Sequence, residues 1–219
     1  MIRWALPLLL LPYQAGACGL ALIFAIDVSL SVNDGEYQLQ MGGLSRALQD
    51  RSVVATLEQI EGGVSLALIQ WSGQLDQEIS HPWRLVRNRT DLSAFSSEVA
   101  RTRRAFATET APGSVIDLAN KYHDQNPHRC LRAVTDVSGD GVQNTGPRTR
   151  LSSAMAAGRG QTINGLVILG DDPDPEDFYR HNVIAGPDSF LEVATGFDDF
   201  QRAMRDKLLR ELPSIVAQN

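Results

Sequence analysis

Short apolar runs alternate along this chain with longer segments in which apolar residues recur at helical spacing. A run of four to eight apolar residues is typical of strands buried on both faces of a parallel sheet. Four segments of this kind are predicted strands: 21–31, 64–71, 130–137 and 162–169. Shorter strands are predicted at 79–85, where Pro82 is tolerated only at an edge or a bulge, and at 190–194.

Helices are predicted between the strands from their caps and their apolar spacing. Asn33 or Asp34 can cap a helix that runs to about residue 60, with a bend or break at Gly42-Gly43. Further helices are predicted at 91–104, 114–123, 148–158 and 197–212. Strands that alternate with helices predict one α/β domain, a three-layer, doubly wound and mainly parallel sheet with helices on both faces.

The first seventeen residues have the features of a secretory signal peptide. Arg3 gives a positive start, residues 5–11 are apolar, and residues 15–17 place small side chains where signal peptidase requires them. The apolar stretch is too short to span a bilayer, and no later segment approaches that length. We therefore predict a signal peptide at 1–17, a domain at 18–219, and a periplasmic or secreted protein without a transmembrane segment.

The sequence contains two cysteines, Cys18 and Cys130. Export to an oxidising compartment makes a disulfide between them plausible. Cys18 lies nine residues before Asp27 and Cys130 ten before Asp140, so both sulfurs would lie at nearly the same height if the two strands were parallel neighbours. Residues 15–18 also loosely match a lipoprotein box that lacks its leucine, and a lipid anchor at Cys18 is the alternative.

Charge and histidine spacing exclude several classes of function. The net charge is −6 and the basic residues are scattered, which argues against a nucleic-acid partner. The densest basic group, Arg101, Arg103 and Arg104, is interpreted as a solvated helix end. The four histidines show no metal-ligand spacing.

Three polar loops follow predicted strands or precede predicted helices, at 27–31, 108–114 and 138–141. A hard dication such as Mg²⁺ takes oxygen ligands, commonly one or two carboxylates with hydroxyls and waters. Two aspartates and three hydroxyls from these loops meet that demand. Because serine and threonine oxygens are neutral, such a site stays underneutralised and keeps affinity for an incoming carboxylate.

The spacing of these residues resembles that of von Willebrand factor type A domains. Asp27, Ser29 and Ser31 match the D-x-S-x-S signature of that family, Asp140-Gly141 matches its second aspartate, and 110–114 resembles its threonine loop. Most of the chain resembles still more closely a bacterial branch, domain of unknown function 1194. The segments that carry this second resemblance are 71–73, 136–141, 162–166 and 182–187.

The resemblance implies a metal-ion-dependent adhesion site that holds Mg²⁺ or Mn²⁺. It implies that Ser29, Ser31 and Thr110 contact the metal directly, whereas Asp27 and Asp140 often act through water. It also implies the strand order 3-2-1-4-5-6, which makes the strands bearing Asp27 and Asp140 neighbours.

We therefore expect an exported, noncatalytic binding module whose metal is completed by an acidic side chain of a partner protein. The alternatives are a structural or scaffold domain with a vestigial metal site and, less favoured, a metal-dependent phosphohydrolase. A phosphatase with an aspartyl nucleophile would have a second Asp where Ser29 stands, and no serine-hydrolase G-x-S-x-G motif occurs. The loop after Asp136 does not fit a calcium-binding EF-hand, because Pro147 stands where a glutamate is required.

Two acidic features keep alternative interpretations. Asp136 lies inside a predicted strand, where it could be structural or could hold a residue of the metal site. The acidic segment 171–177 is interpreted as a solvated loop, with binding of a second cation as the alternative.

Overall fold

Six strands form one sheet in the order β3-β2-β1-β4-β5-β6, in a computed structural model that describes residues 18–170 and 172–212. The strands are β1 (Cys18–Asp27), β2 (Val64–Trp71), β3 (Gln77–Val86), β4 (Cys130–Gly139), β5 (Thr162–Ile168) and β6 (Leu191–Ala194). All neighbours are parallel except β3, which runs antiparallel to β2 at one edge. The fold class and the expected strand order are confirmed.

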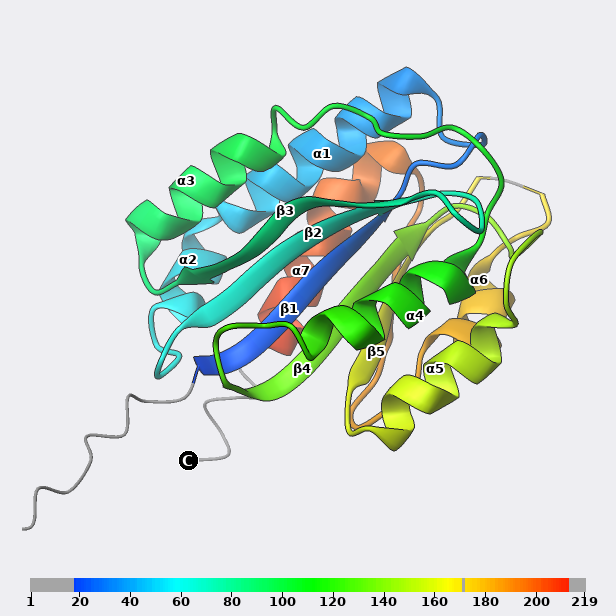
Figure 1. The fold of residues 1–219 in the computed structure, drawn as a ribbon. Helices are drawn as coiled ribbons and strands as arrows, with labels where there is room; N and C mark the ends of the chain where they lie inside the picture. The colour runs from blue at the N-terminus through cyan, green and yellow to red at the C-terminus, as the bar shows by residue number, and fades with distance from the viewer. Residues whose placement is uncertain (1–17, 171, 213–219) are drawn as a thin grey trace, which may run out of the picture.

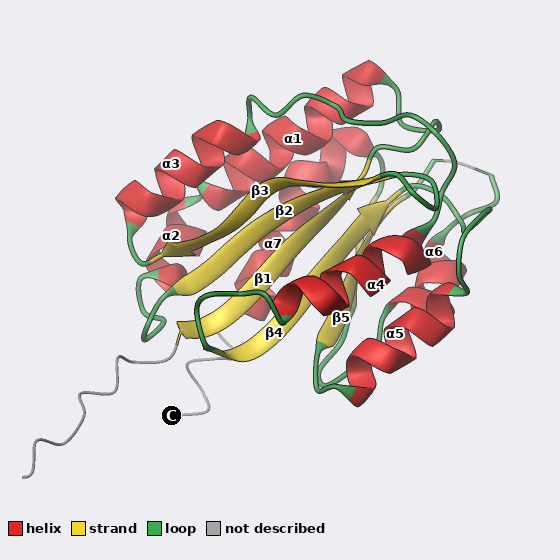
Figure 2. Ribbon diagram, in the orientation of Figure 1, coloured by secondary structure: helices red, strands yellow, loops and turns green. Residues whose placement is uncertain are grey.

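Helices cover both faces of the sheet, as Figure 1 and Figure 2 show. One face carries α1 (Asp34–Leu48), α2 (Arg51–Leu57), α3 (Arg89–Val99) and α7 (Phe200–Glu211). The other carries α4 (Pro112–His123) and α5 (Thr149–Gly158), and three short turns complete the chain: α6 (Glu176–Phe178), η1 (Tyr179–Val183) and η2 (Phe197–Asp199). No helix within the described ranges is long and apolar enough to cross a bilayer.

β1 is the central strand, and all of its residues are buried. Because successive side chains of a strand point to opposite faces, Leu22 and Phe24 join the apolar cluster under α1 and α7, whereas Ile23 and Ala25 join the cluster under α4. The strand ends at Asp27, earlier than predicted, so Ser29 and Ser31 lie in the loop that follows. The alternation thus builds both core layers around one strand.

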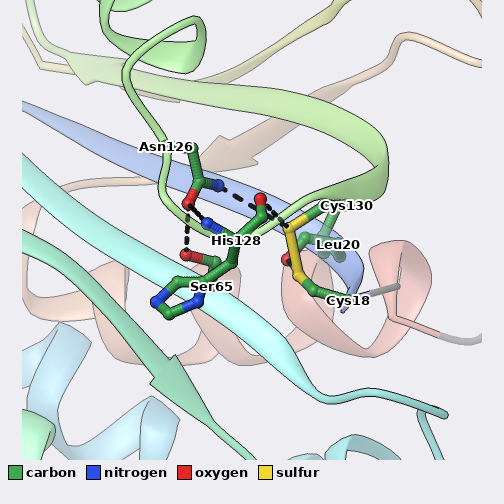
Figure 3. Close-up of a disulfide and its surroundings, with 6 residues drawn as sticks. All are labelled: Cys18, Leu20, Ser65, Asn126, His128 and Cys130. Carbon is green, nitrogen blue, oxygen red and sulfur yellow. Dashed lines mark hydrogen bonds between the residues drawn. A yellow bond between two sulfur atoms is a disulfide. The ribbon is translucent and has the colours of Figure 1, made fainter. Parts of the chain in front are cut away.

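A disulfide joins Cys18 to Cys130 and thereby links the amino ends of β1 and β4. The two residues are directly paired in the parallel register, which is the arrangement that their spacing predicted. Figure 3 shows Asn126 beside this bond, where its Oδ1 accepts from the Ser65 hydroxyl and the His128 amide at 3.2 and 2.9 Å. A thioether to lipid at Cys18 is incompatible with this pairing.

The predicted break at Gly42-Gly43 is wrong. α1 continues through both glycines and ends at Leu48, and α2 begins after Asp50, whose carboxylate accepts from the Ser52 amide at 2.9 Å. Gly43 serves close packing instead, because a Cβ there would lie 2.9 Å from the Phe200 ring of α7. Of the two residues predicted to cap this helix, Asn33 and Asp34, Asn33 is the cap, and it forms a capping box with Glu36.

Two elements near the β3 edge differ in length from their prediction. β3 is longer than 79–85, and Pro82 falls at a register irregularity, as its missing amide requires. α3 ends at Val99 instead of residue 104. Gln70 of β2 donates to the Arg103 carbonyl at 2.9 Å and accepts from the Ala105 amide at 3.1 Å, which satisfies this backbone without a helix.

Candidate metal site

The loop after β1 presents its polar side chains to one point. Asp27 is fully buried, and its Oδ1 accepts from the Ser29 amide at 2.8 Å. The Ser29 and Ser31 hydroxyls lie 3.1 Å apart. Leu30 between them is exposed, whereas the Ser29 amide and both hydroxyls belong to one hydrogen-bonded group with Asp27.

Asp140 completes this group from the neighbouring strand. It follows β4, is buried, and its Oδ1 accepts from the Ser31 hydroxyl at 2.8 Å. A hydrogen-bonded series therefore runs from Asp27 through Ser29 and Ser31 to Asp140. The carboxyl ends of β1 and β4 meet at the end of the sheet opposite the disulfide, where ligands bind in open α/β folds (Figure 1).

Thr110 lies beside this series, on the loop that leads into α4. Its Oγ1 is 3.9 Å from the position that a Cβ would take on Gly141, next to Asp140. Asn144 fixes the loop through two hydrogen bonds. Its side-chain Oδ1 accepts from the Thr110 backbone amide at 2.8 Å, and its backbone amide donates to the Thr110 carbonyl at 3.0 Å. All five predicted site residues thus lie at one end of the sheet, Asp27 as the last residue of β1 and the other four on loops.

Arg104 and Gln40 fix the first loop through its backbone carbonyls. The Arg104 guanidinium donates to the carbonyls of Val28 and Ser29 at 3.0 and 2.8 Å. The Gln40 amide of α1 donates to the Asp27 carbonyl at 3.1 Å. Interpreting Arg104 as part of a solvated helix end is therefore wrong: it binds a loop 75 positions earlier in the chain, which no local pattern reveals.

Tyr179 brings a second unexpected side chain to the site. It is fully buried, and its hydroxyl has no hydrogen-bond partner among the described residues. That hydroxyl and Asp27 Oδ2 each lie 2.5 Å from the position that a Cβ would take on Gly139, so only glycine leaves room for them. Burial and the carboxylates of Asp27 and Asp140 raise the pKa of Tyr179 well above its usual range.

The electrostatics of the site fit a divalent cation. Burial, and after it the charge of Asp140, raises the pKa of Asp27 to about 8. Asp27 Oδ2 is buried and has no hydrogen-bond partner in residues 18–170 or 172–212. A cation between the two buried carboxylates would offset their mutual repulsion and would give the Asp27 Oδ2 atom a partner. The surrounding hydroxyls are hard oxygen ligands of the kind that Mg²⁺ and Mn²⁺ accept.

This donor set contains few of the residues that mark most protein metal sites. Within the described residues, no group of three or more His, Cys, Asp or Glu side chains is arranged to hold a metal ion. A cation here would depend on two carboxylates supplemented by neutral hydroxyls. The two carboxylates match the formal charge of a dication, so the neutral hydroxyls in direct contact are what would leave the cation attractive to an outside carboxylate.

Asp136 points away from this site, although it lies four residues before Asp140. It faces α7, where the Lys207 ammonium contacts its Oδ1, and both side chains are buried. Lys207 also lies 3.6 Å from Glu211. Burial and the nearby Glu211 raise the pKa of Asp136, and Lys207 opposes that shift. Of the two roles considered for Asp136, these contacts favour the structural one.

The acidic loop before η1 uses its carboxylates locally in the part that is described. The Asp174 carboxylate accepts from the Glu176 amide at 2.8 Å, and Glu176 pairs with Arg180 one turn later. Asp171 lies outside the described residues. These contacts give the loop a local structural role.

Comparison with known proteins relates the whole chain to one family and one fold. The sequence profile described as "Protein of unknown function (DUF1194)" matches residues 17–216. No curated protein gives a significant sequence match.

Several solved structures share the fold at low sequence identity. Proximal thread matrix protein 1 from the mussel byssus is 13% identical over 90% of this chain and 48% of its own, with a TM-score of 0.66. Another structure of that mussel protein, at 14% identity over 90% of this chain and 46% of its own and a TM-score of 0.63, has a zinc-occupied MIDAS motif. A von Willebrand factor type A protein from Catenulispora acidiphila is 14% identical over 89% and 43% of the two chains, with a TM-score of 0.62. This chain thus spans about half the length of these structures or less.

Proposed function

The chain belongs to the DUF1194 family and has a von Willebrand factor type A fold, and we propose that it is a noncatalytic, metal-dependent protein-binding module. A divalent cation, Mg²⁺ or Mn²⁺, would be held at the loops after β1 and β4 and before α4. A partner protein would complete its coordination with an acidic side chain. The mussel protein with a zinc-occupied motif supports a metal at such a site in this fold.

One observation carries this proposal: Asp27, which begins the hydrogen-bonded series through Ser29 and Ser31 to Asp140, has a buried second oxygen, Oδ2, without a hydrogen-bond partner among the described residues. A buried carboxylate oxygen without a hydrogen bond is costly, and a protein retains that cost where a ligand relieves it.

Each residue has a distinct part in the proposed site. Ser29, Ser31 and Thr110 would offer hydroxyl oxygens, and Asp27 and Asp140 carboxylates, directly or through water. The bound cation would supply a positive charge that neutral hydroxyls leave partly uncompensated, which attracts a carboxylate from outside. Hard oxygen donors favour Mg²⁺ or Mn²⁺ over Zn²⁺, which takes nitrogen and sulfur ligands more readily.

The Cys18–Cys130 disulfide supports an extracytoplasmic location, because disulfides persist in oxidising compartments. The predicted signal peptide lies outside the described residues and stays a prediction. The same disulfide favours a lipid-free Cys18 in the proposed module.

Titration calorimetry with Mg²⁺, Mn²⁺ and Zn²⁺ tests the site. We expect Asp27→Asn and Asp140→Asn to weaken Mg²⁺ and Mn²⁺ binding at least tenfold, since each removes a charge that faces the cation. The matched control is Asp124→Asn, which changes an exposed carboxylate that forms a salt bridge with Arg159. Equal binding by wild type and both site variants, or none by any of them, would defeat the assignment.

A scaffold domain with a vestigial site is the second candidate, and a phosphohydrolase the third. Association with an acidic partner that survives EDTA would favour the scaffold, whereas its loss with EDTA favours the proposed module. Hydrolysis of a phosphate ester that depends on Mg²⁺ and on Asp27 would favour the phosphohydrolase.

A further inference from the structure

A cavity of about 620 Å³ opens beside the candidate metal site. Its lining residues are Leu30, Ser31, Thr108, Glu109, Thr110 and Asn144. Two of these, Ser31 and Thr110, are proposed metal ligands. Anything bound to the cation from outside therefore lies next to this cavity.

Two leucines project at this end of the sheet. Leu30 is 76% exposed and Leu75 is 90% exposed, the two highest values among the large apolar side chains of the described residues. Single exposed leucines are ordinary on protein surfaces, so exposure alone carries no inference. Their common position is what distinguishes this pair.

Both leucines come from loops bonded to the same residue. The Leu30 amide donates to the Thr108 carbonyl at 2.8 Å, and the amide of Gly73, two residues before Leu75, donates to the Thr108 hydroxyl at 3.0 Å. The Ser72 hydroxyl also accepts from the Thr108 amide at 2.9 Å. Thr108, which lines the cavity, thus fixes both loops: Leu30 lines the cavity itself, and Leu75 is exposed on the second loop. We call Leu30, Leu75 and the cavity the leucine rim.

We propose that the leucine rim binds an apolar side chain of the partner, so that the recognised segment carries an acidic residue with an apolar residue one or two positions away. This inference rests on the proposed function, which places the acidic residue on the cation. An extended chain advances about 3.3 Å per residue, so a side chain one or two positions away reaches the adjoining cavity. Glu109 at the rim disfavours a second acidic side chain there.

Physical chemistry sets the size of the expected effect. Burying a leucine-sized side chain of the partner strengthens binding about tenfold or more, on top of the metal contact. Polar residues at positions 30 and 75 would forfeit that gain. The two leucines are exposed in the free protein, as expected if a segment of the partner covers them only when it binds.

Selection from a phage-displayed library of random peptides tests the inference. The full domain is immobilised, phage are bound in Mn²⁺ and eluted with EDTA, and the selected sequences are read. We expect clones with Asp or Glu one or two positions from Leu, Ile, Met or Phe. The same selection on Leu30→Ser and Leu75→Ser should lose the apolar enrichment, whereas Leu131→Ser should retain it. Leu131 is 66% exposed at the start of β4, at the disulfide end of the sheet, and is the matched control.

Synthetic peptides from the selected clones give the magnitude. Replacing the apolar residue by Ala should weaken binding to wild type about tenfold and leave binding to Leu30→Ser nearly unchanged. Titration of each variant with Mn²⁺ separates an effect on the rim from loss of the metal.

The outcomes distinguish this inference from the function on which it rests. Clones that are acidic and eluted by EDTA but without an apolar preference, or with a preference that Leu30→Ser and Leu75→Ser both retain, overturn the leucine rim and leave the metal-dependent module standing. Clones without acidic residues, clones that EDTA does not release, or no enrichment at all overturn both. A lipid or small-molecule occupant would appear as that last result.

Discussion

Asp27 and Asp136 are both buried aspartates with a second carboxylate nearby, yet the fold treats them differently. Asp136 is near Glu211, and the buried Lys207 ammonium contacts both. Asp27 is near Asp140. Arg104, the cation described beside the Asp27 loop, donates its hydrogen bonds to the backbone carbonyls of Val28 and Ser29 and to the exposed carboxylate of Asp34. The chain thus supplies its own cation to one acidic pair, and at Asp27 it provides hydroxyls instead.

Under the proposed function, this contrast separates a structural use of buried charge at Asp136 from a cation-binding use at Asp27. Burial raises the pKa of both aspartates, so each would prefer to be neutral without a cation. Under α7 the cation is covalently part of the protein and always present. At the candidate metal site the cation would come from solution, so its binding would be reversible and would depend on the cation concentration.

The largest effect is expected from removing the built-in cation. Lys207→Met leaves Asp136 and Glu211 buried without their ammonium, and we expect a loss of about 3–5 kcal/mol in the free energy of unfolding, measured by urea denaturation. Lys121→Met, on an exposed face of α4, is the control and should change stability by less than about 0.5 kcal/mol. A loss below about 1 kcal/mol for Lys207→Met would mean that the acidic pair is not charged in the folded protein.

His123 offers a third way to bury a titratable group, namely by keeping it neutral. Burial lowers its pKa from 6.5 to about 4, and its Nε2 lies 3.1 Å from the Thr135 hydroxyl. As the pH falls below 6.5 the unfolded chain takes up a proton that the folded protein refuses, so stability should fall by up to about 3 kcal/mol before it levels near pH 4. Unfolding of wild type and His123→Gln across this range measures the effect. A variant with the same slope as wild type would assign the pH dependence to other groups.

Matched amide substitutions should separate the two aspartates by sign. In EDTA at neutral pH, Asp27→Asn removes a buried carboxyl next to Asp140 and should raise the free energy of unfolding by about 1–3 kcal/mol. Asp136→Asn removes the partner of Lys207 and should lower it by a similar amount. Adding Mn²⁺ at about 100 times its Kd for wild type should stabilise wild type by about 2.7 kcal/mol, and Asp27→Asn, which binds at least tenfold more weakly, by about 1.4 kcal/mol or less. Equal signs for the two substitutions would remove the distinction drawn here.

The smallest effect concerns the Tyr179 hydroxyl. Since it makes no hydrogen bond among the described residues, Tyr179→Phe loses little and should change stability by less than about 1 kcal/mol, in the stabilising direction. Thermal unfolding in EDTA measures this. A clear loss of stability would show that water links the hydroxyl to Asp27 in solution.

The sequence was informative where its signals are local. Buried strands follow from apolar runs, and the start of α1 follows from the capping residues Asn33 and Asp34, of which the structure selects Asn33. The cysteine pairing followed from counting along two strands, and Asp27 and Asp140 lie at and just after the ends of β1 and β4, where the sequence placed them. The strand order came from the resemblance to von Willebrand factor type A domains, which no periodicity could supply.

Contacts between distant segments escaped prediction. Arg104 serves a loop far earlier in the chain, and Tyr179 reaches Asp27 from the turn after β5. Gly43 has the composition of a helix break, but the Phe200 ring of α7 explains it as a packing position. In each case the partner, not the residue type, determines the role, and the partner is known only once the chain is folded.

The disulfide and the candidate metal site lie at opposite ends of the same strand, which gives the molecule a direction for mechanical load. If a partner binds at Asp27 as proposed, a pull between it and the chain at Cys18 acts along β1, in shear against the parallel neighbours β2 and β4, so that many ladder hydrogen bonds share the tension. The Cys18–Cys130 bond passes part of that tension covalently to β4, whose far end carries Asp140. Single-molecule pulling with and without reductant would measure that share.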